Sequence, residues 1–110
     1  ALLAHSGASE AQIEELVAVG LISPDVRGRY SQQNLRTVRL AMEITRKGVP
    51  LRNLRAVRAS AEREADTIEQ AVAPRRSRSR SAGEETAREL AELVADLHTI
   101  LLRRAIDALG

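Results

Sequence analysis

Apolar residues recur at helical spacing along most of the chain, and residues that start or stop helices separate the runs. Ser9 and Gln12 form a capping-box pattern, so a helix is predicted from Glu10. Gly20 ends this helix, because glycine readily takes the left-handed conformation of a helix end. The inner face of the helix consists of Ile13, Leu16 and Val17.

The segments on either side of this helix complete a recognisable unit. Leu2 and Leu3 predict a short first helix that stops before Gly7. Two short helices joined by a tight turn have the layout of a helix-turn-helix motif. After the second helix, turn-forming residues leave room only for a short hairpin within residues 22–30. We interpret this hairpin as a reduced wing.

Two longer helices are predicted next. Ser31 caps the third helix and Gly48 stops it. Its inner face consists of Leu35, Val38, Ala41, Met42 and Thr45. Pro50 suits the first turn of the fourth helix, which at 1.5 Å per residue is about 36 Å long. Its apolar stripe consists of Leu51, Leu54, Val57, Ala61, Ala65, Ile68 and Val72.

A connector and a fifth helix complete the chain. Pro74 either kinks or ends the fourth helix, and residues 75–83 form an Arg/Ser-rich connector. The connector is either an exposed linker, a phosphate-binding tether or a phosphorylation site. The fifth helix runs from Glu84 to the end. The predicted division is therefore a winged-helix-like domain over residues 1–74, the connector over 75–83 and a dimerisation helix over 84–110.

The last helix has more apolar surface than one partner needs. Its apolar sector spans about 200 degrees at about 100 degrees per residue, whereas about 100 degrees is enough to dock on its own domain. We therefore predict a homodimer that forms through this helix. Arg104 falls inside the sector and is expected to reach out to solvent or to pair with an acid across the interface. The alternative is that the first short helix covers the sector. The predicted dimerisation residues are Leu90, Leu93, Val94, Leu97, Ile100, Leu101, Leu102, Arg104, Ala105, Ile106 and Leu109.

Composition narrows the class of protein. The 110 residues predict one small domain, and the absence of cysteine excludes disulfides and thiolate metal sites. Tyr30 is the only aromatic residue, so an aliphatic core is expected, with Tyr30 at the base of the wing. No apolar run approaches the length of a membrane span, which predicts a cytoplasmic protein with no membrane partner. Because the chain does not begin with Met, we expect it to be part of a longer protein.

No pattern of residues indicates catalysis. His5 and His98 have no partners at metal-ligand spacing, no glycine-rich phosphate loop is present, and no nucleophile stands beside a base. His98 borders the apolar sector and is expected to be packed or half-exposed. We therefore predict that the protein is not an enzyme and holds neither a metal nor a cofactor.

Basic residues dominate positions 27–58, where Glu43 is the only acid. They are either solvated helix faces, a surface for DNA phosphates without sequence preference, or a dock for an acidic partner. The candidate contacts to the DNA backbone are Arg27, Arg29, Tyr30, Arg36 and Arg39.

Three segments resemble the MerR family of transcriptional regulators: Gly-Leu-Ile at 20–22, Gly-Arg-Tyr-Ser at 28–31 and Lys-Gly-Val-Pro-Leu at 47–51. Residues 63–64, 68–74, 88–93 and 97–98 are more narrowly similar to the C-terminal half of the actinobacterial cell-division regulators of FtsR type. The resemblance implies a winged helix, a long dimerisation helix and a separate N-terminal DNA-binding domain.

The expected recognition helix departs from the family. It carries Glu10, Glu14 and Glu15, whereas members that bind DNA have Arg and Tyr there, and Gln12 is its only plausible base reader. We therefore predict a C-terminal regulatory and dimerisation domain with a degenerate winged helix. DNA is then bound through the parent protein's N-terminal domain, and this chain binds it at most non-specifically. The alternatives are a DNA-binding domain that contacts phosphates through the wing and third helix, or a domain for an unknown small-molecule effector.

Overall fold

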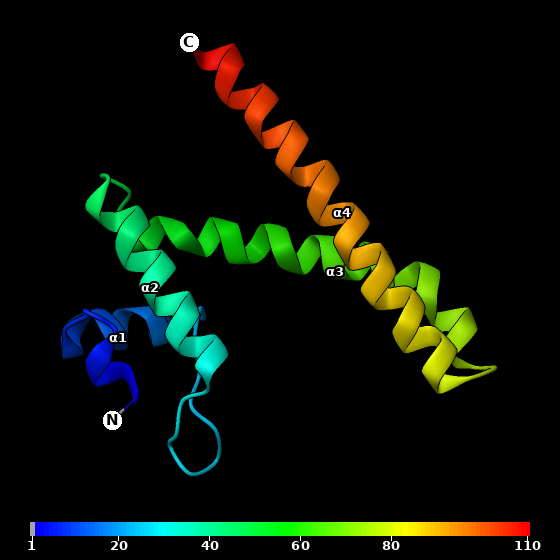
Figure 1. Ribbon diagram of the computed structural model, residues 1–110, viewed down its shortest axis with the longest axis horizontal. Helices are drawn as coiled ribbons and strands as arrows, with labels where there is room; N and C mark the ends of the chain where they lie inside the picture. Colours follow the sequence, from blue (N-terminus) through cyan, green and yellow to red (C-terminus); the bar gives the residue numbers. More distant parts are fainter. Residues whose placement is uncertain (1) are drawn as a thin grey trace. The chain divides into compact units, whose positions relative to one another are not determined.

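A computed structural model describes the backbone of residues 2–110 and the side chains from Ala4 onward. The elements are η1 (Leu2–His5), α1 (Glu10–Ala18), α2 (Gln32–Arg46), η2 (Leu51–Leu54), α3 (Arg55–Arg76) and α4 (Arg80–Leu109), where η is a 3-10 helix (Figure 1). No strand occurs within residues 2–110, which confirms the all-α prediction. The alternative that the first helix covers the last one rests on the side chains of Leu2 and Leu3, which lie outside the described residues.

The chain forms two compact units, one up to Ser60 and the other from Ala61 to Gly110. In the first unit α2 contacts both 3-10 helices, and η2 also contacts α1. The buried core consists of Leu16, Ile22, Leu35, Val38, Ala41, Met42, Leu51 and Leu54. Tyr30 packs half-buried against this core, and no other aromatic residue exists to fill it, so aliphatic side chains supply the hydrophobic free energy.

The helix boundaries of the first unit follow from capping chemistry. The N–H of Gln12 donates to the Ser9 hydroxyl at 3.1 Å, and the Ser9 N–H donates to the Gln12 side chain at 2.8 Å, which confirms the capping box. Ser31 caps α2 by accepting from the N–H of Asn34 at 3.1 Å. Gly20, with a φ of +81°, follows α1 as its left-handed terminator.

The predicted hairpin is not formed, because a side chain closes the loop between α1 and α2. Oδ1 of Asp25 accepts the N–H groups of Arg27 and Arg29 at 2.8 and 2.9 Å. The Asp25 N–H donates to the Arg29 carbonyl at 2.7 Å, and this one cross-loop bond does not extend into a ladder. Asn34 ties the loop to α2 by donating to the Ser23 carbonyl at 3.0 Å.

The fourth predicted helix begins differently and the connector is shorter than expected. Pro50 precedes the 3-10 helix η2, so the α-helix starts only at Arg55. Pro74 lies inside the last turn of α3, where a missing N–H removes only one bond of the helix. α4 already begins at Arg80, because Ser79 caps it by accepting the N–H of Ala82 at 3.3 Å. Only residues 77–79 separate the two helices.

Candidate self-association surface

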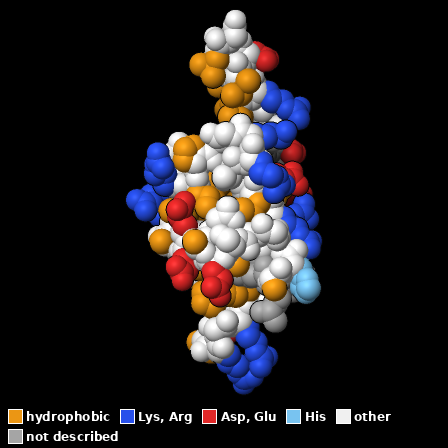
Figure 2. All heavy atoms as spheres, turned by 90° about the vertical axis from the view of Figure 1, so that its left-hand side faces the viewer, with side chains coloured by type: hydrophobic (Ala, Val, Ile, Leu, Met, Phe, Trp, Pro, Cys, Tyr) orange, Lys and Arg blue, Asp and Glu red, His pale blue; other side chains and the backbone are white. Residues whose placement is uncertain are grey.

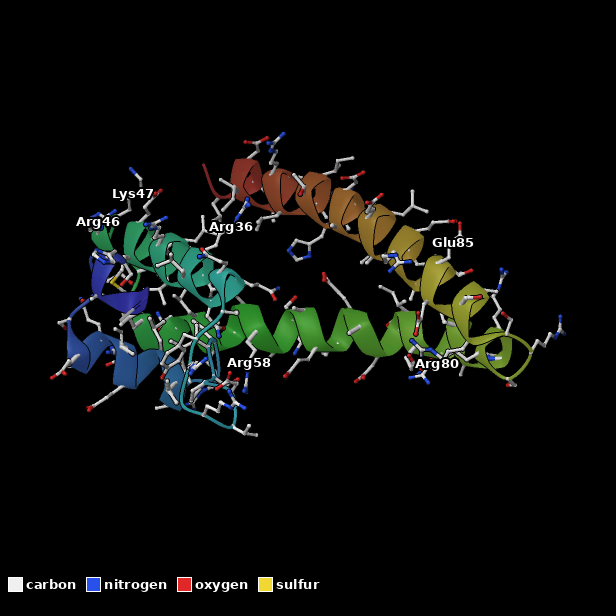
Figure 3. All side chains as sticks on the ribbon, turned by 60° about the horizontal axis from the view of Figure 1, so that its bottom comes forward. Arg36, Arg46, Lys47, Arg58, Arg80 and Glu85 are labelled. Atoms are coloured by element: carbon white, nitrogen blue, oxygen red, sulfur yellow. The ribbon has the colours of Figure 1, made fainter. Side chains whose placement is uncertain are left out.

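The start of α4 packs closely on the end of α3. Gly83 is buried, and a Cβ there would lie 3.2 Å from the backbone N and Cα of Arg76. Val72 is fully buried, and the predicted dimerisation residues Leu90 and Val94 are half-buried. The two helices lie side by side near their turn and separate toward the carboxyl end of α4 (Figures 1 and 3). Leu90 and Val94 thus belong to the inner face of this unit.

His98 and Glu64 connect the two helices farther from the turn. Nδ1 of His98 lies 2.8 Å from Oε1 of Glu64, and both side chains are partly exposed. This position agrees with the prediction of a half-exposed histidine. A polar contact between side chains this exposed adds at most about 1 kcal/mol to stability.

The second half of α4 consists of exposed residues. Every residue from position 95 to 110 is exposed. The predicted dimerisation residues of this stretch are Leu97, Ile100, Leu101, Leu102, Arg104, Ala105, Ile106 and Leu109. Its large apolar side chains, together with Leu93, expose between 40% and 83% of their surface. A contiguous apolar surface of this kind typically marks a protein–protein contact.

The exposed apolar residues of α4 form two stripes. Leu93, Leu97 and Ile100 share one side of the helix, at spacings of four and three residues. At about 100 degrees per residue, Leu102, Ile106 and Leu109 fall on the opposite side. We call these the first stripe and the second stripe. A single partner helix covers about 100 degrees, so it leaves one of the two stripes exposed.

The candidate DNA contacts are mostly exposed and lie on different elements. Arg27 and Arg29 lie in the loop before α2, while Arg36 and Arg39 lie on α2 itself. Tyr30 is half-buried against the core, which leaves less of its ring for a phosphate contact. Figure 3 shows Arg46 and Lys47 together at the carboxyl end of α2.

Acidic residues interrupt the basic surface. Glu10, Glu14 and Glu15 of α1 are all exposed. Figure 2 shows both signs of charge on one face, with Lys and Arg toward its margins and Asp and Glu among hydrophobic side chains nearer its middle. DNA that approached such a face would meet carboxylates as well as guanidinium groups.

The Arg/Ser segment is partly tied to the helices it joins. Arg76 pairs with Glu69, and Nε of Arg80 lies 3.5 Å from Oε1 of Glu84. The Ser77 hydroxyl donates to the Ala73 carbonyl at 3.2 Å, so it continues the last turn of α3. The phosphate-binding and phosphorylation alternatives for this segment stay predictions.

Sequence reasoning missed an apolar hollow in the first unit. It has a volume of about 190 Å³ and is lined by Leu21, Thr37, Leu40, Ala41, Ile44, Leu54 and Val57. Leu40 and Ile44 could have indicated it, because they are apolar residues of α2 that lie outside the inner face predicted for that helix. We call this feature the α2 hollow.

Comparisons with known proteins give the chain a family. Residues 1–110 match the family described as Rv1828-like, C-terminal domain. The HTH-type transcriptional regulators Mb1859 of Mycobacterium bovis and Rv1828 of Mycobacterium tuberculosis are each 29% identical to the chain over 109 residues. These alignments cover 96% of the chain and 44% of each relative, so the chain spans less than half of their length. Within residues 2–110 no helix combines the length and apolarity that a bilayer span requires. The chain belongs to the family of Rv1828-like C-terminal domains, whose matched relatives are named as helix-turn-helix transcriptional regulators.

Proposed function

We propose that this chain is the C-terminal regulatory and dimerisation domain of a MerR-type transcriptional regulator. The family assignment to a C-terminal domain supports it, as does the alignment with less than half of two helix-turn-helix regulators. The segments at 20–22, 28–31 and 47–51 resemble the MerR family and support the narrower assignment to it. In the full-length protein, a separate domain reads the operator and this domain holds two copies together.

The observation that carries the proposal is the exposed second half of α4. A helical stretch with as few tertiary contacts as residues 95–109 is marginal in water, since most helix stability in proteins comes from packing. Full burial of a Leu or Ile side chain contributes about 1.5–3 kcal/mol, and this stretch offers several. A second copy of the same chain supplies the missing cover in the simplest way, because a two-fold contact buries the surface on both copies.

The charge of α1 supports the assignment of DNA reading to another domain. Duplex DNA carries one negative charge per about 1.7 Å of axis, so the exposed Glu14 and Glu15 would be repelled in a groove. A good bidentate base contact adds only about 1–3 kcal/mol, and Gln12 is the one candidate on this helix. Binding by this domain alone is therefore weak and indifferent to sequence.

Analytical ultracentrifugation of this chain tests the proposal. We expect a dimer at micromolar concentrations and a monomer for the double variant Leu97→Glu/Leu102→Glu, because each of the two stripes then carries a carboxylate on both copies. The double variant Ala11→Glu/Val26→Glu adds the same charge at exposed positions outside α4 and should stay dimeric. A wild-type chain that sediments only as a monomer over this range rejects the proposal.

A further inference from the structure

The α2 hollow is an open apolar site rather than a closed cavity. Its rim residues Leu40, Ile44 and Val57 expose between 40% and 61% of their surface. The volume of about 190 Å³ exceeds the roughly 150 Å³ of an engineered cavity that binds benzene, so it accommodates one or two branched aliphatic side chains. A groove of this kind between helices suits the apolar side of a partner helix.

Basic residues flank the hollow. Arg36 precedes Leu40 by four residues, and Lys47 follows Ile44 by three, so helical spacing puts both next to the rim. Glu43 lies between them on the same side and is the only acid of residues 36–58. The helix that fits this site therefore presents branched aliphatic side chains flanked mainly by carboxylates.

The first stripe of α4 has this composition. Leu93, Leu97 and Ile100 are exposed, and Glu89 and Asp96 border them on one side. Residues 84–97, which hold the Leu93 and Leu97 part of the stripe, contain five acids and one base: Glu84, Glu85, Glu89, Glu92, Asp96 and Arg88. The acidic flank ends before Ile100, because Arg103 and Arg104 follow it. The stripe is exposed in its own unit, so it is available to a second copy.

We propose that the first stripe of one copy docks in the α2 hollow of a second copy, and that the contact occurs twice about a two-fold axis. The proposal rests on the self-association proposed above and names the surface that receives α4. It leaves the second stripe, on the opposite side of the helix, to pair with its equivalent or with another part of the parent protein. Reciprocal docking buries both the apolar α2 hollow and the apolar first stripe on each copy.

Disulfide trapping between two different chains tests the contact, because the protein has no cysteine of its own. One chain carries Val57→Cys and the other, of different mass, carries Leu97→Cys; both positions are exposed, so the fold should persist. A disulfide requires Cα atoms closer than about 7 Å. We expect mild oxidation of the mixture to give the mixed dimer in large excess over either homodimer. A predominance of Leu97→Cys homodimers overturns the proposal and indicates that α4 pairs with α4.

Charge reversal supplies the second test. We expect Arg36→Glu/Lys47→Glu and Glu89→Arg/Asp96→Arg each to weaken self-association at least about tenfold, since each places like charges across both contacts. Mixed together, these two chains should form a heterodimer of about wild-type affinity, because opposite charges then meet at both contacts. Arg39→Glu, on the other side of α2, is the control and should change the affinity less than about twofold.

The two proposals fail in different ways. A wild-type chain that is monomeric in sedimentation rejects the proposed function. The docking contact is rejected if the wild-type chain is dimeric but neither the mixed disulfide nor the charge-reversed heterodimer forms. In that case the dimer forms through the second stripe.

Discussion

The side chain of Arg58 fills the space above Gly20. A Cβ built on Gly20 would lie 3.0 Å from Cζ of Arg58 and 3.2 Å from its Cδ. Gly20 also has a φ of +81°, which other L residues rarely adopt. Glycine at position 20 therefore serves two purposes. It takes the left-handed conformation that ends α1, and it leaves room for the Arg58 side chain of α3.

We predict that Gly20→Ala destabilises the protein more than Gly28→Ala does. Gly28 has a similar φ of +77° but no atom within 4 Å of a built Cβ, so its replacement measures the backbone cost alone, about 1–2 kcal/mol. The new Cβ would also displace the end of the Arg58 side chain, which should add up to about 1 kcal/mol at Gly20. Urea unfolding followed by circular dichroism measures both values. Equal losses, or no recovery when Arg58→Ala accompanies Gly20→Ala, would contradict the role of this contact.

Gly83→Ala should also destabilise, although alanine favours a helix over glycine by about 0.5–1 kcal/mol. Gly83 lies in the first turn of α4, where a Cβ would meet the Arg76 backbone at 3.2 Å. The new Cβ would push α3 and α4 apart, which should cost more free energy than the higher helix propensity of alanine contributes. We expect the free energy of unfolding to fall by about 1–2 kcal/mol. Ala82→Gly, at the exposed neighbouring position, reports the propensity term alone. A Gly83→Ala protein with a raised Tm would show that the close approach is not needed.

Val72→Ala tests the packing of the second unit. Val72 is 0% exposed, so the change removes buried methyl groups and should cost about 2 kcal/mol. Hydrogen exchange should speed up in α4 near residues 83–94 and stay unchanged in α2. Val26→Ala in the exposed loop is the matched control and should cost less than about 0.5 kcal/mol. Equal effects of the two changes would mean that α3 and α4 are not held by this contact.

Glu14→Arg/Glu15→Arg should raise the affinity for duplex DNA without creating sequence preference. Each new phosphate contact adds about 0.9 to the slope of log K against log salt, so the slope should steepen by up to about two. We expect a promoter duplex and a scrambled duplex to compete equally well for the wild-type and the variant protein. If the wild-type chain already prefers one sequence more than about a hundredfold, the DNA-binding alternative is correct.

Local signals were enough to predict α1 and α2. The caps at Ser9 and Ser31 and the stop at Gly20 each depend on neighbours within a few residues, so the sequence predicts them well. The inner face of α2 was confirmed for the same reason, because helical spacing alone puts Leu35 and Val38 on one side.

The predictions that were wrong or incomplete have two causes. Either two local hydrogen-bond patterns compete, or the feature depends on contacts between residues distant in sequence. Asp25 closes its loop with side-chain hydrogen bonds, which compete with strand pairing. Pro74 and Gly83 suggested a long connector, but Pro74 lies in a last turn and Gly83 allows α4 to approach Arg76. The α2 hollow joins Leu21 to Val57 across three elements, and no spacing rule relates those positions.

Hydrogen exchange of residues 95–110 as a function of protein concentration tests dimerisation through α4, since it reports both where and whether a second copy binds. Well above the dissociation constant of the dimer, these amides should exchange at least about tenfold more slowly than in dilute protein, while those of α1 near the buried Leu16, outside the α2 hollow, change little. Exchange of residues 95–110 that is the same at every concentration would contradict dimerisation through α4.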